Sequence, residues 1–352
     1  MRIRKAVLTA GGRATRLRPI TSTINKHLLP LANKPMIFHA IEKLAAAGMA
    51  EIFINTNPGD LELPRAVGDG SRWGVGIRCF PQTGGPQGLA HAIAESKKFI
   101  GDEPFVAYLG DNILLGSVEE MLELYDAERY DCLLALAQVE DPKAFGVPRF
   151  DGSGRLVEIV EKPADPPSNL AVIGIYIYGP KMFFNAFSQI KKSARGEYEI
   201  SDVHTALIKS GKRVGYKEIT GWWKDTGKPE DLLMANKLLL EQKGQGPNAG
   251  DGIEIGEGSA LGQGVRLIGP IIIGADCVLE NCTIGPNVTV GQGSRLAGAT
   301  VRDSILLDEV VLLGRICLEQ SILGKGARVV SRQSGILPPA KIIIGDKTVI
   351  EL

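Results

Sequence analysis

The start of the chain combines a flexible turn with a cluster of cations. Residues 7–30 run from an apolar segment through Gly11 and Gly12 and end in a Leu-Leu-Pro sequence. Paired glycines let backbone N–H groups approach an anion closely, and arginine or lysine neutralises its charge. The cations of this segment are Arg13, Arg16, Arg18 and Lys26. The segment therefore predicts a phosphate-binding turn large enough for a triphosphate.

The glycine pair by itself has a second interpretation. It lacks the Gly-Lys-Ser/Thr of a Walker A loop and the spaced glycines of a dinucleotide fingerprint. A tight strand-to-helix turn with solvated arginines explains Gly11 and Gly12 equally well. Other residues must decide between a structural turn and a binding site.

Two aspartates follow apolar or aromatic segments elsewhere in the chain. Asp111 stands in Leu-Gly-Asp-Asn, and Asp225 stands in Trp-Lys-Asp-Thr-Gly. Two carboxylates on separate loops suit a phosphate-bound Mg²⁺, which takes hard oxygen ligands and keeps several waters. The alternative is that each aspartate caps a helix or closes a turn, which is the more common role of a single aspartate.

Three polar segments add candidates for phosphate, sugar and base contacts. Lys162 would meet a second phosphate and Glu161 would accept hydrogen bonds from sugar hydroxyls, although a solvated charge pair before a proline is commoner. Arg195 is a further cation beside a helix start, with the alternative that Ser201 or Asp202 simply caps the helix. Gln82 lies in a Gly/Pro-rich loop, and its amide has the paired donor and acceptor that read a base edge.

The elements that position these residues follow from the hydrophobic pattern. Up to about residue 240, short β-branched segments alternate with helical patterns, which is typical of an α/β fold with a Rossmann-like, mixed, mainly parallel sheet. The predicted strands cover residues 5–9, 51–56, 76–81, 105–109, 132–138, 155–160 and 171–178. The predicted helices cover 36–47, 89–99, 118–126 and 232–242. Ligands of such sheets bind at the carboxyl ends of the strands, where Gly11 and Asp111 both fall.

The chain beyond residue 250 has a different pattern. Pairs of an aliphatic residue and glycine recur at six-residue spacing or its multiples, with one slip of a residue. They are Ile255-Gly256, Leu261-Gly262, Ile273-Gly274, Ile284-Gly285 and Val290-Gly291. Short repeats of this kind predict a left-handed parallel β-helix of hexapeptide repeats. A Gly-rich sandwich with accidental spacing is the alternative.

Length and composition bound the remaining choices. A chain of 352 residues is longer than a single hydrophobic core usually organises, so two domains are expected. The 40 basic and 40 acidic residues cancel, so the net charge gives no indication of binding to nucleic acid or an anionic membrane. Five cysteines without paired metal-ligand spacing indicate buried thiols in a reducing compartment. No signal peptide or long apolar span is evident. We expect a cytoplasmic protein with domains at 1–240 and 252–352, joined by a linker at 241–251.

The order and spacing of the motifs are more specific than any single one. The motifs are Gly11-Gly12-x-x-Thr15-Arg16-Leu-Arg-Pro, Lys26-His-Leu-Leu-Pro30, Gly68-Asp-Gly-Ser-Arg-Trp-Gly74, Gly88-Leu-Ala-His-Ala92, Leu109-Gly-Asp-Asn112, Glu161-Lys-Pro163, Gly174-Ile-Tyr176 and Trp223-Lys-Asp-Thr-Gly227. Up to about residue 231 the chain resembles the sugar-1-phosphate nucleotidylyltransferases, and most closely the glucose-1-phosphate thymidylyltransferases of the long, repeat-tailed kind.

The resemblance implies a role for each matching position. The catalytic cations would be Arg16, Lys26 and Lys162. The nucleotide would be held by Gly11, Gly12, Gln82, Gly88 and Asp111. The sugar phosphate would be held by Gly146, Glu161, Lys162, Gly174 and Arg195. The cofactor would be Mg²⁺, with Asp111 and Asp225 as its ligands. One position departs from the family: Ala14 replaces a usual glycine, so a positive φ there would strain the loop.

The implied reaction is the transfer of a nucleotidyl group. A sugar 1-phosphate, expected to be glucose 1-phosphate, attacks the α-phosphorus of a triphosphate, expected to be dTTP, in line; an NDP-sugar forms and pyrophosphate leaves. The attacking phosphate is already an anion, so catalysis needs positioning and charge neutralisation rather than a general base. UTP or GTP with another sugar phosphate remains open, as does a catalytically silent sugar-nucleotide sensor.

The repeats have a separate expected role. All four histidines lie at or before residue 204, so the repeats lack the histidine base that acyltransferases of similar fold commonly need. We expect the repeats to serve assembly or regulation. The expected partners are the small-molecule substrates and further copies of the chain in a homo-oligomer.

Overall fold

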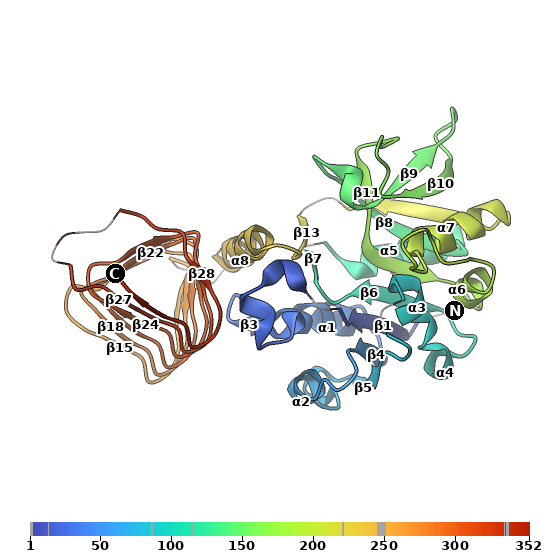
Figure 1. Cartoon of the computed structure of the whole chain (residues 1–352). Helices are drawn as coiled ribbons and strands as arrows, with labels where there is room; N and C mark the ends of the chain where they lie inside the picture. Colours follow the sequence, from blue (N-terminus) through green and yellow to red (C-terminus); the bar gives the residue numbers. More distant parts are fainter. Residues whose placement is uncertain are drawn as a thin grey trace. The chain divides into compact units, whose positions relative to one another are not determined.

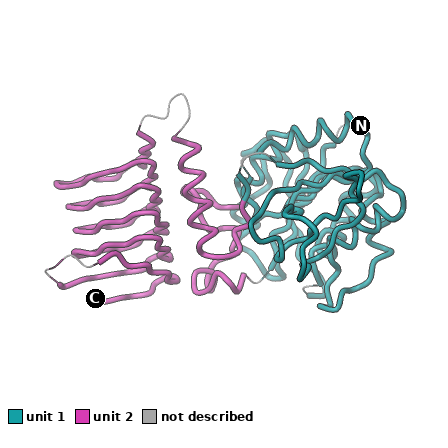
Figure 2. The backbone as a smooth tube through the Cα atoms, turned by 90° about the horizontal axis from the view of Figure 1, so that it is seen from above, with its two compact units in different colours: residues 1–12, 37–223 teal, residues 13–36, 224–352 magenta. Residues whose placement is uncertain are grey.

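The computed structural model describes residues 3–12, 14–85, 87–114, 116–219, 222–244, 251–333, 335 and 338–352. Arg13 of the predicted phosphate turn and residues 245–250 of the predicted linker lie outside these ranges. The chain forms two compact units, coloured separately in Figure 2: unit 1 is Met1–Gly12 with Ile37–Trp223, and unit 2 is Arg13–Met36 with Lys224–Leu352. The domain boundary predicted at residue 240 stays a prediction, and neither unit ends there.

Unit 1 is built on one mixed sheet (Figure 1). Nine strands of the described chain form it: β1 (Lys5–Ala10), β4 (Glu51–Thr56), β5 (Gly76–Pro81), β6 (Phe105–Leu109), β8 (Cys132–Gln138), β9 (Gly146–Phe150), β10 (Leu156–Glu161), β11 (Leu170–Tyr178) and β12 (Val214–Glu218). The main path runs β10-β9-β11-β6-β1-β4-β5, and β8 connects β11 to β12. The predicted strands are all present, with bounds that agree to within one residue.

Parallel pairing dominates around the first strand. β1 runs parallel to β4 and to β6, and β4 runs parallel to β5, whereas β11 pairs antiparallel with β6 and β8. The carboxyl ends of β1, β4 and β6 therefore lie at the same sheet edge. This arrangement confirms the predicted Rossmann-like fold class.

Helices and short elements complete unit 1. The helices are α1 (Met36–Ala46), α2 (Glu62–Val67), α3 (Leu89–Ala94), α4 (Lys97–Ile100), α5 (Val118–Glu128), α6 (Met182–Phe187) and α7 (Ile200–Lys209). The short elements are β7 (Asn112–Leu114), η4 (Ser71–Trp73) and η5 (Pro142–Ala144). The start of α5 follows a local rule, since the Ser117 hydroxyl accepts a hydrogen bond from the Glu120 N–H at 3.3 Å.

The single helix predicted over 89–99 is wrong, because the structure has two. Between α3 and α4, the Ser96 hydroxyl donates to the Ile93 carbonyl at 2.6 Å, and the Ser96 N–H bonds to the same carbonyl at 3.0 Å. Serine competes in this way with the regular helical hydrogen bond. The apolar pattern continues through the break because both helices face the same core.

Unit 2 contains the β-helix, drawn in orange to red in Figure 1. Its described coils stack into three parallel faces. The first face is β14 (Ile253–Ile255), β17 (Ile271–Ile273), β20 (Val288–Val290), β23 (Ile305–Leu306), β26 (Ile322–Leu323) and β28 (Ile343–Ile344). The second is β15 (Ala260–Leu261), β18 (Val278–Glu280), β21 (Arg295–Ala297), β24 (Val311–Leu313), β27 (Arg328–Val330) and β29 (Val349–Glu351). The third is β16 (Arg266–Leu267), β19 (Thr283–Ile284), β22 (Thr300–Arg302) and β25 (Cys317–Glu319).

The repeat pattern matches the interior of the coils. Ile273, Ile284 and Val290 are fully or almost fully buried in one aliphatic core, which also holds Cys277 and Cys282. Ile255 and Leu261 are 45% and 43% exposed because they belong to the first described coil, on which no earlier described coil stacks. The predicted left-handed β-helix is confirmed.

The remaining elements of unit 2 precede the β-helix in sequence. They are η1 (Thr15–Leu17), η2 (Ile20–Ser22), η3 (Lys26–Leu28), β2 (Pro30–Leu31), β3 (Lys34–Pro35) and α8 (Pro229–Gly244), and β13 (Trp223–Asp225) crosses the boundary between the units. Among the described helices, none is both long enough and apolar enough to cross a bilayer.

A buried histidine in α7 generates a prediction about acid stability. His204 is fully buried, and its Nε2 lies 2.7 Å from the Tyr178 hydroxyl. Burial lowers the pKa of His204 to about 3. Below pH 6.5 the imidazole is protonated in the unfolded chain but stays neutral in the folded chain. The free energy of unfolding therefore falls as the pH decreases. Lowering the pH from 7.5 to 5.5 should reduce the contribution of His204 to the free energy of unfolding by about 1.3 kcal/mol.

Urea unfolding at the two pH values measures this loss. His204→Phe should remove about that increment from the pH dependence, whereas His39→Gln, at a half-buried position, should leave it in place. An identical pH dependence in His204→Phe and the unaltered chain would contradict the assignment.

Candidate active site

The glycine turn after β1 is surrounded by amide side chains. The Gly12 N–H donates to Asn57 Oδ1 at 2.9 Å, and Asn57 Nδ2 donates to the Gly12 carbonyl at 3.0 Å. A Cβ at Gly11 would lie 3.5 to 3.6 Å from oxygens of Asn55, Asn57 and Gln82. The predicted nucleotide residues Gly11, Gly12 and Gln82 therefore lie together at the carboxyl edge of β1, β4 and β5.

Asn55 and Asn57 were not predicted from the sequence. Both lie at or just after the end of β4, so the strand-edge rule that selected Gly11 would also have selected them. The Asn55 side chain is fully buried, and its amide has no hydrogen-bond partner among the described residues. A buried amide of this kind is costly unless something pairs with it.

Asn112 connects Asp111 to two other elements. Its Nδ2 donates to Asp111 Oδ1 at 2.9 Å, and its Oδ1 accepts from Trp223 Nε1 at 2.6 Å and from the Gly174 N–H at 3.3 Å. Gly174 sits in β11, where a Cβ would lie only 2.7 Å from Leu109 Cβ. Glycine at 174 thus allows β11 to approach the loop that carries Asp111.

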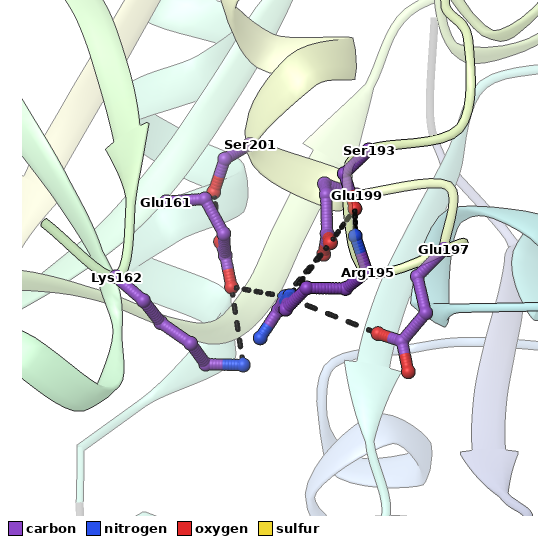
Figure 3. Close-up of polar contacts among 7 residues, drawn as sticks. All are labelled: Glu161, Lys162, Ser193, Arg195, Glu197, Glu199 and Ser201. Atoms are coloured by element: carbon purple, nitrogen blue, oxygen red, sulfur yellow. Dashed lines mark hydrogen bonds and ion pairs between the residues drawn. The ribbon is translucent and has the colours of Figure 1, made fainter.

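The predicted sugar-phosphate residues form one charged cluster (Figure 3). Glu161 ends β10, and its Oε1 lies 3.3 Å from Lys162 Nζ and 3.3 Å from Arg195 Nη2. Lys162 has a φ of 44°, which is a left-handed backbone conformation unusual for lysine. Such a conformation is held only where surrounding structure imposes it, and it is enriched at binding sites.

The cluster includes a buried glutamate that the sequence reasoning missed. The side chain of Glu199 is only 8% exposed, and its Oε1 lies 2.8 Å from Arg195 Nη2 and accepts from Arg195 Nε at 3.2 Å. The Ser193 hydroxyl donates to the same oxygen at 2.7 Å. Hydrogen bonding to Glu199 raises the pKa of Arg195. The guanidinium is therefore held from one side in a fixed orientation.

Ser201 also belongs to this cluster rather than to a helix cap. Its hydroxyl donates to Glu161 Oε2 at 2.5 Å, and the residue that precedes α7 is Glu199, which makes no side-chain capping bond. The alternative that Ser201 or Asp202 caps the helix is therefore wrong, because both lie inside its first turn. Burial, followed by the charges of Glu199 and Glu161, raises the pKa of Asp202.

Two glycines permit close contacts around the cluster. Gly146 begins β9, and a Cβ there would lie 2.5 Å from Ser201 Oγ. Gly88 has a φ of 98°, and a Cβ there would lie 2.6 Å from the Tyr198 carbonyl oxygen. Gly88 of the predicted nucleotide set therefore abuts the loop that carries Arg195.

The other predicted residues belong to unit 2. Arg16 lies in η1, Lys26 begins η3 and Asp225 ends β13. A Cβ at Gly227 would lie 3.1 Å from Arg16 Nη2 and 3.4 Å from Asp225 Oδ2, so these two side chains converge over a glycine. Ala14 adopts φ 45° and ψ 38°, a left-handed conformation that is strained for alanine. The binding roles of all these residues stay predictions.

The similarities of the chain identify its family. Residues 5–242 match the family model described as nucleotidyl transferase. The chain belongs to the nucleotidyl transferase family. It is an enzyme of that family, of the kind that acts on sugar 1-phosphates.

Similar proteins extend over nearly the whole chain. A glucose-1-phosphate thymidylyltransferase of Streptomyces antibioticus is 37% identical over 99% of both chains. The low-salt glycan biosynthesis nucleotidyltransferase Agl11 of Haloferax volcanii is 39% identical over 99% of this chain and 100% of that protein.

Solved structures resemble part of the chain. A Bacillus anthracis structure described as a putative glucose-1-phosphate thymidylyltransferase in complex with a sucrose is 36% identical, with a TM-score of 0.62, over 66% of this chain and 94% of that one. A UDP-glucose pyrophosphorylase complexed with UDP-glucose is 28% identical, with a TM-score of 0.59, over 68% of this chain and 99% of that one.

The Glu199 contact predicts a selective effect on phosphate binding. Glu199→Gln keeps the shape but removes the charge that holds Arg195, so affinity for a hexose 1-phosphate should fall about 10-fold, or about 1.4 kcal/mol. Calorimetric titration measures it. Glu158→Gln, which breaks an ion pair between β10 and Arg149 of the neighbouring strand β9, is the control and should change affinity less than about 2-fold. Equal affinities in Glu199→Gln and Glu158→Gln would remove Glu199 from this role.

The conformation of Ala14 predicts a stabilising substitution. Left-handed backbone costs an alanine about 1–2 kcal/mol, while glycine adds about 0.5–1 kcal/mol of unfolded-state entropy. Ala14→Gly should therefore raise the free energy of unfolding by about 0.5–1 kcal/mol. Denaturant titration checks this against Ala45→Gly inside α1, which should lower stability by about 1 kcal/mol. A loss of stability in both variants would contradict strain at Ala14.

Proposed function

We propose that this enzyme transfers a thymidylyl group from dTTP to glucose 1-phosphate and releases pyrophosphate. The observation that carries the proposal is the cluster of Glu161, Lys162 and Arg195, which combines two cations with a carboxylate suited to sugar hydroxyls. Similarity to a glucose-1-phosphate thymidylyltransferase over 99% of both chains supports this choice of substrates.

The chemistry is a single in-line displacement. An oxygen of the sugar phosphate forms a bond to the α-phosphorus of the triphosphate, and the bond from the α-phosphorus to the bridging oxygen breaks, so the electron pair leaves with pyrophosphate. The nucleophile is already anionic and needs no proton acceptor. The enzyme contributes positioning and neutralisation of charge.

Residues of unit 1 bind and orient the sugar phosphate. Lys162 and Arg195 neutralise its charge, and Glu161 accepts hydrogen bonds from sugar hydroxyls. The buried carboxylate of Glu199 keeps the Arg195 guanidinium in place while its exposed edge faces the ligand. Gly146 and Gly174 let neighbouring elements pack closely around these groups, because a side chain at either position would collide with neighbouring atoms.

Other residues hold the nucleotide. The glycine turn at Gly11 and Gly12 receives the phosphates, and Arg16 and Lys26 stabilise the departing pyrophosphate. Gln82, with Gly88, reads the base, because its amide carries a donor and an acceptor.

We assign Mg²⁺ to Asp111 and Asp225. Hard carboxylate oxygens suit Mg²⁺, which commonly binds through only one or two protein carboxylates. Among the described residues there is no group of three or more side chains that would suit a metal ion with more protein ligands. Within unit 1, Asp111 accepts a hydrogen bond from Asn112. Within unit 2, Asp225 and the cation Arg16 lie beside the same glycine, Gly227. When bound, the ion would neutralise charge on the phosphates.

A second candidate differs in its substrates. The similarity to Agl11, a nucleotidyltransferase named for glycan biosynthesis, favours a different base or sugar, such as UTP or GTP with another hexose phosphate. Each base contact contributes only about 1–3 kcal/mol of discrimination, so a small number of substitutions is enough to change the preferred base.

The predicted homo-oligomer stays a prediction.

Substrate choice is tested with purified full-length enzyme. Release of pyrophosphate is measured for dTTP, UTP, GTP, ATP and CTP against several sugar 1-phosphates. The pair dTTP and glucose 1-phosphate should give a kcat/KM at least about 10-fold above any other, which corresponds to about 1.4 kcal/mol. A higher value for another pair supports the second candidate. Nucleotide binding without any pyrophosphate release would identify a silent sensor.

The metal assignment predicts a large loss of turnover. Asp111→Asn keeps the shape of the side chain but removes a charged ligand, so kcat should fall at least about 100-fold while the Tm stays close to that of the unaltered enzyme. Turnover is measured across a Mg²⁺ titration. Asp151→Asn, an exposed turn aspartate, is the control and should retain normal turnover. Near-normal Mg²⁺-dependent turnover in Asp111→Asn would exclude Asp111 from the mechanism.

A further inference from the structure

The segment 14–36, which carries Arg16 and Lys26, belongs to the same compact unit as the β-helix (Figure 2). This grouping was not expected, because the segment follows β1 directly in sequence and continues the phosphate turn. The contacts that hold it are therefore informative about what the β-helix does.

The end of the segment is anchored to α8 and to the first face of the β-helix. The Ala32 N–H donates to Asn236 Oδ1 at 2.8 Å, and the Thr289 hydroxyl approaches the same oxygen at 3.5 Å. Asn33 Nδ2 donates to the Val290 carbonyl at 2.8 Å and approaches the Ile272 carbonyl at 3.4 Å. Asn33 has a φ of 55°, a left-handed conformation that asparagine tolerates better than most residues.

The middle of the segment is anchored to the last coil. The Thr23 hydroxyl donates to Asp346 Oδ2 at 2.6 Å. A Cβ at Gly345 would lie 2.8 Å from the Pro19 carbonyl oxygen, so a side chain there would displace the segment. The anchors therefore fall on both sides of Lys26 along the chain.

Burial of the first face agrees with these contacts. Ile272, Thr289, Ile305 and Ile322 alternate with residues of the β-helix core, yet all are less than 10% exposed. On the second face, the corresponding Val278 and Val349 are 45% and 60% exposed. The first face is thus a covered surface, while the second is open in the described chain.

We propose that the β-helix is a positioning element for the triphosphate-binding segment, with Thr23, Asn33 and Asp346 as its positioning residues. The anchors restrict the backbone on either side of Lys26 before ligand binds, so less conformational entropy is lost when phosphates bind. The inference rests on the proposed role of Arg16 and Lys26 in holding the triphosphate, and it holds for any base.

The test uses a matched pair of full-length variants. Asp346 Oδ1 accepts from the Lys325 N–H at 2.8 Å, and Asp308 Oδ1 accepts from the Gln292 N–H at 3.0 Å. Asp346→Ala and Asp308→Ala therefore each remove an equivalent hydrogen bond within a turn. Only Asp346→Ala also removes the hydrogen bond from the Thr23 hydroxyl. Thr23→Val removes the hydroxyl from the other side, and Thr23→Ser restores it.

Pyrophosphate is the probe because every nucleotidyl transfer releases it, whatever the base. Its Kd, measured by calorimetry, should rise about 10-fold in Asp346→Ala and Thr23→Val. It should stay within about 2-fold of the unaltered value in Asp308→Ala and Thr23→Ser. In Asp346→Ala and Thr23→Val, KM for the triphosphate should rise together with the pyrophosphate Kd, while KM for the sugar phosphate stays unchanged. The Tm of Thr23→Val should also stay unchanged.

Two results would overturn the proposal. One is an unchanged pyrophosphate Kd in Asp346→Ala and Thr23→Val. The other is evidence of general loosening of the coils, seen either as an equal rise in Asp346→Ala and Asp308→Ala or as a rise that always accompanies a lower Tm. Failure of the proposed substrates appears instead in the substrate panel with the unaltered enzyme, so the two failures are distinguishable.

Discussion

Parallel pairing of β1 with β4 and β6 is the constraint on which the site of unit 1 depends. Strands that run in one direction end at one edge, so residues distant in sequence are collected there without any direct attraction between them. Gly11, Asn57 and Asp111 reach that edge from three different strands. The apolar strand interiors stabilise the sheet, and the polar residues lie at its edge, where we propose that the phosphates bind.

Charge is arranged asymmetrically around the sugar-phosphate cluster. The Glu199 carboxylate is buried and fixed by the surrounding structure, whereas part of the Arg195 guanidinium stays exposed to solvent. A buried carboxylate without a cation would be costly, which ties the fold of this loop to the presence of Arg195. The same interaction therefore stabilises the structure and orients the guanidinium that we propose binds the sugar phosphate.

The β-helix gains a role that its histidine-free sequence left open. Its repeats form a rigid surface, one face of which holds the segment that carries Arg16 and Lys26. A rigid stack of coils is well suited to this, because each coil is fixed by its neighbours and moves little on its own. Assembly and regulation remain compatible with the exposed second face.

Much of this protein follows from local sequence. Strand positions, the β-helix repeats and the charged motifs are set by periodicity and residue type over a few positions, and the corresponding expectations for strands and fold class agree with the structure. The break between α3 and α4 was missed because one serine hydrogen bond decides it. Glu199, Asn55 and the attachment of segment 14–36 to the β-helix were decided only by tertiary structure. The burial of Glu199 and Asn55 depends on how distant segments pack around them. The segment 14–36 is attached through partners far apart in the sequence, such as Thr23 and Asp346, and no local pattern encodes which distant groups will meet.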